Sequence, residues 1–144
     1  MNLTLKGRTA LVSGGFGLVG FEIVQRFLDN GMNVGTLHSR KEKAWMTTQW
    51  LKEHGDRFLS LSGDISEVLT RVNEKFGGLD VLVSAHGWPP VNQEMENISD
   101  DYWEAVIRSN LTISFRLMQR SLPYLKKSPA PRIIFMTSAE ARFG

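Results

Sequence analysis

The sequence of 144 residues contains no cysteine. Disulfide bonds and thiolate chemistry are therefore excluded, and the composition gives no sign of an oxidising compartment. No uninterrupted apolar run is long enough to span a bilayer, and residues 1–6 lack the apolar centre of a signal peptide. We therefore expect a cytoplasmic protein that has no membrane partner.

A strong excess of charge of either sign is also missing. The 17 basic and 15 acidic side chains leave a formal net charge of +2, and the basic residues are scattered along the chain. No stripe of positive charge can follow a phosphate backbone, so we expect no nucleic-acid partner, and we assign no metal site. With 42% hydrophobic residues, a chain of this length can bury one core, which predicts a single domain over residues 1–144.

Glycine, by contrast, is concentrated in one stretch near the N-terminus. The apolar residues 10–12 are followed by Ser13-Gly14-Gly15-Phe16-Gly17-Leu18-Val19-Gly20. Glycines let the chain turn sharply after a buried strand and approach a pyrophosphate, which the N–H groups and dipole of the following helix can bind. Three glycines at Gly14, Gly17 and Gly20 also suit an ordinary tight turn between a strand and a helix.

The residues after the glycines favour nucleotide binding. One helical face collects Gly20, Ile23, Val24, Phe27 and Leu28. Asn30-Gly31 then stops this helix, and the apolar residues 34–37 predict a second strand. A strand, a glycine turn, a helix and a second strand within about thirty residues form the βαβ unit in which such a turn binds a dinucleotide.

The second predicted strand ends in Leu37-His38-Ser39-Arg40-Lys41. A carboxylate at this position accepts hydrogen bonds from the ribose hydroxyls of NAD, whereas a cationic side chain pairs with the extra phosphate of NADP. The chain has Ser39 and Arg40 here and no acid, so we expect NADP as the cofactor in preference to NAD. The alternative is that Arg40 and Lys41 simply begin a solvated helix.

Helices and strands continue to alternate in the middle of the chain. The pattern predicts helices over residues 42–54 and 68–76 and strands over residues 58–61 and 79–85. Trp45 and Trp50 are expected to cover the flank of the first of these helices. Asp64 follows the third strand and either bonds an adenine amino group or caps the next helix. Residues 84–90 form a loop at the carboxyl edge of the sheet, where open α/β proteins bind ligands.

A long helix is predicted over residues 99–122, with Ser99 as its cap and a stop near Pro123. Its inner stripe comprises Trp103, Val106, Ile107, Asn110, Ser114, Leu117, Met118 and Ser121. We therefore expect the Asn110 amide to be buried and hydrogen-bonded. A second apolar stripe of Leu111, Phe115 and Leu122 indicates a surface covered by another subunit, and hence a homo-oligomer.

A fifth strand is predicted over residues 132–137, directly before Ser138. Together the elements predict an α/β protein of Rossmann type. Its doubly wound parallel sheet has the strand order 3-2-1-4-5 and lies between helices in three α/β/α layers. The fifth strand forms an apolar edge, which favours pairing between chains.

The order and spacing of these motifs resemble the short-chain dehydrogenase/reductase family over essentially the whole chain. The glycine turn at residues 13–20, Gly63-Asp64-Ile65 at the adenine contact and the run 76–87 carry the resemblance, followed by Asn110-Leu111-Thr112 and Arg132-Ile133-Ile134-Phe135-Met136-Thr137-Ser138. The resemblance implies cofactor contacts at Ser13, Gly14, Gly15, Phe16, Gly17, Leu18, Ser39, Arg40, Asp64, Ile65, Ala85, His86 and Gly87.

The resemblance also implies an activity. In this family a hydride passes between the nicotinamide and a carbonyl or alcohol carbon of a small molecule, and a tyrosine with a neighbouring lysine transfers the proton. Ser138 would hold the substrate oxygen, and Asn110 would support a water in the proton relay. The family's Tyr-x-x-x-Lys follows the serine by roughly a dozen residues and does not occur in these 144 residues, since neither Tyr102 nor Tyr124 has a lysine four places on.

Two functions follow from that departure. The chain is either the cofactor-binding part of an NADP-dependent oxidoreductase whose activity needs further residues, or a non-catalytic truncated dinucleotide-binding module. In both cases we expect the 144 residues alone to be inactive.

Two motifs also depart from the family: Leu18 replaces the second glycine of its main branch, and Ser84-Ala85-His86-Gly87 replaces Asn-Asn-Ala-Gly. His86 is then either a proton donor near the nicotinamide or an imidazole that fills the loop.

Overall fold

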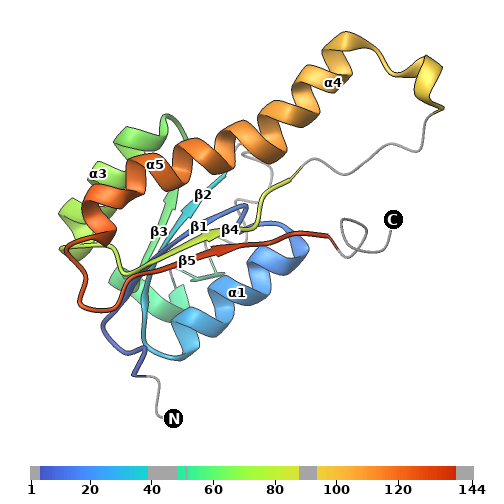
Figure 1. The fold of residues 1–144 in the computed structure, drawn as a ribbon. Helices are drawn as coiled ribbons and strands as arrows, with labels where there is room; N and C mark the ends of the chain where they lie inside the picture. The colour runs from blue at the N-terminus through green and yellow to red at the C-terminus, as the bar shows by residue number, and fades with distance from the viewer. Residues whose placement is uncertain (1–3, 39–48, 51, 88–93, 139–144) are drawn as a thin grey trace.

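Five parallel strands form the centre of the computed structural model, which describes residues 4–38, 49–50, 52–87 and 94–138 (Figure 1). The strands are β1 (Thr9–Ser13), β2 (Asn33–Leu37), β3 (Phe58–Leu61), β4 (Val81–Ser84) and β5 (Arg132–Phe135). They pair side by side in the order β3-β2-β1-β4-β5, and every pairing is parallel. The predicted fold class and strand order are therefore confirmed.

Helices cover both faces of the sheet. They are α1 (Leu18–Asp29), α3 (Ile65–Phe76), α4 (Asp100–Ile107) and α5 (Ile113–Leu125), and the short helical turns are η2 (Gly55–Arg57), η3 (Met95–Asn97) and η4 (Arg108–Thr112). In Figure 1, α1 lies on one face and α3 with α5 on the other. Residues 49, 50 and 52–54 are helical, whereas most of the helix predicted over 42–54, with Trp45, lies outside the described residues.

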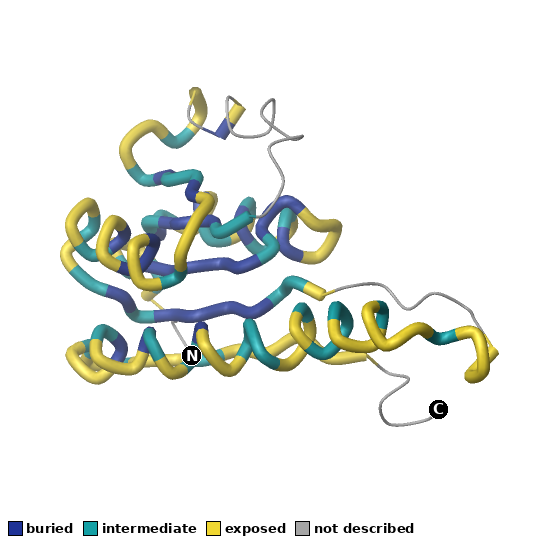
Figure 2. Tube along the Cα trace, turned by 90° about the horizontal axis from the view of Figure 1, so that it is seen from above, coloured by how far each residue is buried: buried dark blue, intermediate teal, exposed yellow. Residues whose placement is uncertain are grey.

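Two hydrophobic cores result from the alternation of side chains along the strands. Val12 of β1 points to the core under α1, together with Val24 and Leu28. Leu11, its neighbour in sequence, points to the opposite core with Val72 of α3. Successive residues of a strand face opposite sides, so a strand covered on both faces is buried along its length. Figure 2 shows the buried strands between helices whose outer sides are exposed.

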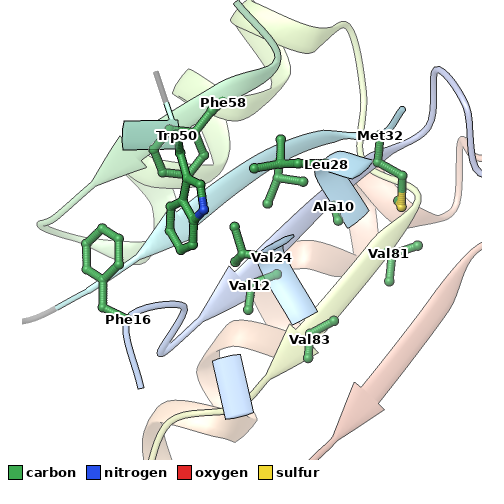
Figure 3. Packing of buried hydrophobic residues seen from close by; sticks show 11 residues of the cluster. Ala10, Val12, Phe16, Val24, Leu28, Met32, Trp50, Phe58, Val81 and Val83 are labelled. Atoms are coloured by element: carbon green, nitrogen blue, oxygen red, sulfur yellow. The ribbon is translucent and has the colours of Figure 1, made fainter. Parts of the chain in front are cut away.

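Trp50 belongs to the core under α1 and does not cover the flank of a helix. It is only 1% exposed, and its ring lies 5.7 Å from Phe16 and 5.1 Å from Phe58 between ring centroids (Figure 3). The centroid of the Phe21 ring lies 5.0 Å away. The indole N–H donates to Gln25 Oε1 at 2.7 Å, which satisfies its one polar group. The expected flank position was wrong because Phe16 and Phe21, which lie about thirty residues earlier in the chain, enclose the indole together with Phe58 of β3.

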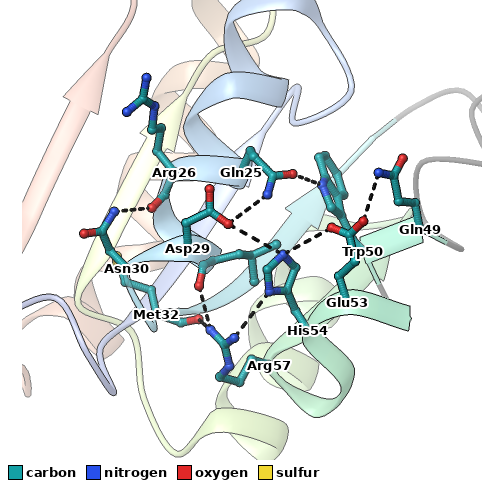
Figure 4. A network of polar contacts seen from close by, with 11 residues as sticks. Gln25, Arg26, Asp29, Asn30, Met32, Gln49, Trp50, Glu53, His54 and Arg57 are labelled. Atoms are coloured by element: carbon teal, nitrogen blue, oxygen red, sulfur yellow. Dashed lines mark hydrogen bonds and ion pairs between the residues drawn. The ribbon is translucent and has the colours of Figure 1, made fainter.

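Arg57 holds the end of α1 against the start of β3. Its guanidinium donates to the carbonyl oxygens of Leu28 at 2.8 Å and Met32 at 3.3 Å, and it lies 3.3 Å from His54 Nδ1 (Figure 4). Carbonyl groups at the end of a helix have no partner within the helix, and a cation satisfies them well. The network therefore closes the C-terminal end of α1.

The long helix is continuous, but it contains a π turn near the edge of the sheet. Ser99 Oγ accepts a hydrogen bond from the Tyr102 N–H at 3.2 Å, which confirms the predicted cap. The π turn η4 separates α4 from α5, and α5 runs two residues past Pro123 to Leu125. The expected inner stripe was wrong at its start, where Trp103 is 56% exposed. Figure 1 shows the reason: α4 extends past the strands, so its stripe has no sheet to face.

Two apolar surfaces remain exposed. On the helix, Leu111 is 64% and Phe115 52% exposed, and on the edge strand β5 the exposure of Ile134 is 43% and of Phe135 42%. The second apolar stripe and the apolar edge are thus present as predicted. Within the described part of the chain, no helix is both long enough and apolar enough to span a bilayer.

The contact between α1 and the glycine turn makes a direct prediction about stability. A Cβ added at Gly20 would lie 2.1 Å from the Gly14 carbonyl oxygen, so the backbone itself must move. We expect Gly20→Ala to lower the free energy of unfolding in urea by about 1–3 kcal/mol. Gly78→Ala is the control, since nothing lies within 4 Å of its added Cβ. Equal stability of the two variants would contradict this account of the turn.

Candidate functional site

The candidate site lies at the carboxyl edge of the sheet. The parallel strands place the turn after β1, the loop after β4 and the segment after β5 along one edge. The Met136 N–H donates to the Ser84 carbonyl at 3.0 Å, so the ends of β4 and β5 stay adjacent beyond the last paired residues. This arrangement brings three sequence-predicted segments together, which are residues 13–18, residues 85–87 and Ser138.

The glycines of the turn allow close contact between protein segments. Gly14 has a φ of +78°, and a Cβ there would lie 2.7 Å from the backbone nitrogen of His86. A Cβ at Gly15 would lie 2.7 Å from the Thr36 side chain. Together with the close approach of Gly20 in α1 to the Gly14 carbonyl, these contacts agree with the ordinary explanation for the glycines, a tight turn between a strand and a helix. It does not compete with cofactor binding, because the same packing brings the N-terminus of α1 to the sheet edge.

The N-terminus of α1 fits a bound anion. Gly17 occupies the cap position with extended backbone, and no side chain caps the helix. Leu18, the first helical residue, is 93% exposed, so its side chain covers nothing at this end. Phe16 points elsewhere, since its ring is 7% exposed and lies 4.8 Å from the His38 ring. Backbone N–H groups of the first turn are the donors that a pyrophosphate would meet.

His86 is surrounded by serine hydroxyls. Nδ1 lies 2.7 Å from Ser13 Oγ and 3.3 Å from Ser84 Oγ, and Nε2 lies 3.4 Å from Ser114 Oγ. The hydroxyls of Ser84 and Ser114 are 3.1 Å apart. Ser13 and Ser84 are almost fully buried at the ends of β1 and β4, so their hydroxyls need protein partners. The imidazole supplies one to each.

Burial lowers the pKa of His86 below its ordinary value of 6.5, and a hydrogen bond to the backbone of Ser109 partly opposes the shift. Desolvation disfavours the charged imidazolium, and the hydroxyl and carbonyl partners of the ring carry no charge to compensate. The ring is therefore held as a neutral hydrogen-bonding group. Sequence reasoning placed His86 at the site but missed Ser84 and Ser114 as its partners, because residues from a strand end and a helix meet only in the folded chain.

Asn110 lies in the π turn and is exposed, so the expected burial was wrong. Its amide nitrogen donates to the Val106 carbonyl at 2.9 Å and to Ser109 Oγ at 3.1 Å. Its Oδ1 faces the loop after β4, since a Cβ added at Gly87 would lie 2.9 Å from it. The helix leaves the sheet at this turn, which is why the amide is open to solvent and still touches the site.

Asp64 caps α3, which is one of the two alternatives predicted from the sequence. Its Oδ1 accepts from the Ser66 N–H at 2.8 Å, and its Oδ2 lies 3.1 Å from the Arg120 guanidinium. The hydrogen bond from the Ser66 backbone, followed by the Arg120 contact, lowers the pKa of this carboxyl. An adenine contact at Asp64 stays a prediction. Ile65 begins α3 and packs against the second core.

Of the other predicted site residues, two lie within the described part of the chain and two lie outside it. Ala85 packs against the core under α1, and Ser138 is exposed after β5. Ser39 and Arg40 lie outside the described residues. His38, directly before them, donates its N–H to the Leu61 carbonyl at 3.0 Å and places Nε2 3.0 Å from Ser60 Oγ.

Comparison with known proteins identifies the family. The family model for short chain dehydrogenases matches residues 8–144. The sorbose reductase sou1 of Schizosaccharomyces pombe is 33% identical in an alignment of 143 residues that covers 94% of this chain and 56% of that protein. The 3-oxoacyl-[acyl-carrier-protein] reductase FabG of Chlamydia pneumoniae is 27% identical over 150 residues, with 100% of this chain and 60% of that protein covered. The chain thus belongs to the short-chain dehydrogenase family, and it spans little more than half the length of these relatives.

Solved structures agree on the fold. A Brucella melitensis protein described as a short-chain dehydrogenase/reductase of glucose/ribitol dehydrogenase type superposes with a TM-score of 0.86 at 26% identity, over 100% of this chain and 62% of that one. ElxO with NADP bound superposes with a TM-score of 0.79 at 21% identity, over 91% of this chain and 55% of that one. The second likeness establishes the fold alone.

The lowered pKa of His86 predicts a pH dependence of stability. The unfolded chain binds a proton at this residue near pH 6.5, whereas the folded chain binds it only at lower pH. Below pH 6.5 the unfolded state therefore holds more protons, and the free energy of unfolding falls as the pH falls. We expect urea unfolding at about pH 5.5 and about pH 7.5 to differ less in His86→Gln than in the parent. If the two pH values give the same difference in stability in His86→Gln as in the parent, the lowered pKa of His86 is contradicted.

Proposed function

We propose that this chain is the cofactor-binding part of an NADP(H)-dependent oxidoreductase that acts on a carbonyl or alcohol group of a small molecule. Membership of the short-chain dehydrogenase family, over residues 8–144, is the observation that carries the proposal. The relatives named above are reductases of different substrates, so the proposal names a reaction class and no particular substrate.

The residues of the chain have separate roles in this proposal. The turn at residues 13–18 and the N-terminus of α1 hold the pyrophosphate, and Asp64 with Ile65 contacts the adenine. Ala85, His86 and Gly87 border the nicotinamide. The cofactor, when bound, accepts or supplies the hydride. The open cap of α1 at Gly17 and the close packing at Gly14 support the fit of a dinucleotide at this edge.

Two polar residues of the chain would act on the substrate side. Ser138 would donate a hydrogen bond to the substrate oxygen, and it lies exposed directly after β5. Asn110 would hold a water of the proton relay, and its solvent-open position in the π turn is compatible with that role. π turns of this kind often occur at functional positions.

The preference for NADP(H) rests on Arg40. No carboxylate occurs in Leu37-His38-Ser39-Arg40-Lys41, so nothing there would bind the ribose hydroxyls of NAD or repel a phosphate. A guanidinium pairs with a phosphate through two parallel hydrogen bonds, which a lysine cannot do. Arg40 is therefore the residue that we expect to recognise the additional phosphate of the cofactor.

Titration with both cofactors tests the proposal. We expect the purified chain to bind NADPH at least about tenfold more tightly than NADH, since a charge-assisted hydrogen bond contributes about 1.5–3 kcal/mol. Arg40→Ala should remove most of this preference by weakening NADPH binding alone. Lys41→Ala is the matched control and should retain it. Equal affinities in the parent, or no loss in Arg40→Ala, would assign Arg40 to a solvated helix.

A second candidate function is a non-catalytic dinucleotide-binding module. The observation that favours it is that neither Tyr102 nor Tyr124 is followed by a lysine four residues later. A positioned acid or base contributes about a hundredfold to ten-thousandfold to the rate, so the 144 residues alone should bind NADPH without oxidising it. Carbonyl-dependent NADPH oxidation by the purified chain tests this expectation. Robust turnover would mean that another residue donates the proton.

We also propose that the chain forms a homo-oligomer. The exposed Phe115 and the exposed edge at Ile134 support this, since both surfaces are apolar and unpaired edge strands favour association. The molar mass in solution should exceed that of one chain, and either Phe115→Lys or Ile134→Lys should lower it. Met95→Lys is the control, because Met95 is 81% exposed on η3, outside both surfaces. A monomeric parent at high concentration would refute the proposal.

A further inference from the structure

The imidazole of His86 stands between the sheet and the long helix. On the sheet side, Nδ1 contacts the hydroxyls of Ser13 at 2.7 Å and Ser84 at 3.3 Å, which end the central strands β1 and β4. On the helix side, Nε2 faces Ser114 Oγ of α5 at 3.4 Å. One side chain therefore contacts three separate elements of the fold.

The long helix is held at this point by hydrogen bonds from side chains. A π turn lengthens the spacing of backbone hydrogen bonds and leaves carbonyl groups for other donors. Side chains serve these carbonyls: Asn110 and Ser109 both donate to Val106 O, at 2.9 Å and 3.2 Å, and Ser114 donates to Asn110 O at 3.0 Å. The Ser114 hydroxyl donates its single proton to Asn110 O, so it can only accept from His86 Nε2. The neutral ring therefore carries its proton on the helix-facing nitrogen and accepts from Ser13 at Nδ1.

Gly87 adds a second contact between the same two segments. A Cβ there would lie 2.9 Å from Asn110 Oδ1, so the loop after β4 also touches the Asn110 side chain. His86 thus contacts Ser114, whose hydroxyl bonds Asn110 O, and Gly87 contacts the Asn110 side chain. Two consecutive residues of the loop after β4 therefore hold the segment that carries Asn110.

We propose that His86 is a positioning residue, whose imidazole holds the π turn, and with it Asn110, against the carboxyl ends of β1 and β4. Both ring nitrogens face groups of the protein, so the ring holds the site in place and does not transfer a proton to substrate. The role of this contact in catalysis rests on the proposed function. The contact itself is independent of that function.

Hydrogen exchange of the cofactor-free chain tests the proposal. Ser13→Ala removes the nearer of the two sheet-side partners of the ring and leaves Ser84 at 3.3 Å. We expect the amides of residues 108–114 to exchange several-fold faster, and about tenfold faster in His86→Ala, while amides of β1 and α1 keep their rates. In the double variant, Ser13→Ala should add little to His86→Ala, because both act through one contact.

Ser60→Ala is the matched control, since it removes a serine hydroxyl that bonds another imidazole, that of His38, at the same sheet edge. This variant should leave the amide exchange rates of residues 108–114 at their parental values. Parental rates in both Ser13→Ala and His86→Ala, or an equal rise throughout the chain, would overturn the proposal. If His86→Ala does not fold, Ser13→Ala decides. The measurement needs no NADPH, so its failure is distinct from a failure of cofactor binding.

Discussion

The burial of β1 on both faces and both edges is the constraint on which the rest of the structure depends. All five of its residues are buried, and it pairs with β2 on one side and β4 on the other. Because its side chains alternate between two cores, helices must cover both faces of the sheet. Because neighbouring strands pair with both edges of β1, the chain leaves this strand at its end. The glycine turn and the N-terminus of α1 therefore lie at the carboxyl edge of the sheet.

The same burial explains the chemistry at that edge. Ser13 and Ser84 end the two central strands with almost no exposure, and a buried hydroxyl without a partner costs free energy. His86 meets this requirement with a neutral ring and, through its other nitrogen, reaches the helix that carries Asn110. The hydrogen bonds that satisfy the core are therefore the ones that organise the candidate site.

Much of this fold is predictable from local sequence. The positions of β1, β3 and α3 agree with the predicted elements within a few residues, because alternating or helical spacing of apolar residues reflects which side faces a core. The turn at Gly14 and the cap at Asp64 are equally local, since each depends on backbone geometry within a few residues.

The site depends on contacts between distant segments. Trp50 is buried by aromatic rings from three other segments, and Trp103 is exposed because the helix continues past the sheet. Helical periodicity assigned Asn110 to a buried face, but the π turn shifts the spacing and the sheet ends there. The sequence by itself determined the order of elements, the strand order and the family. Only the tertiary structure decided which groups His86 contacts, because hydrogen-bond partners 28 and 73 residues away carry no local pattern.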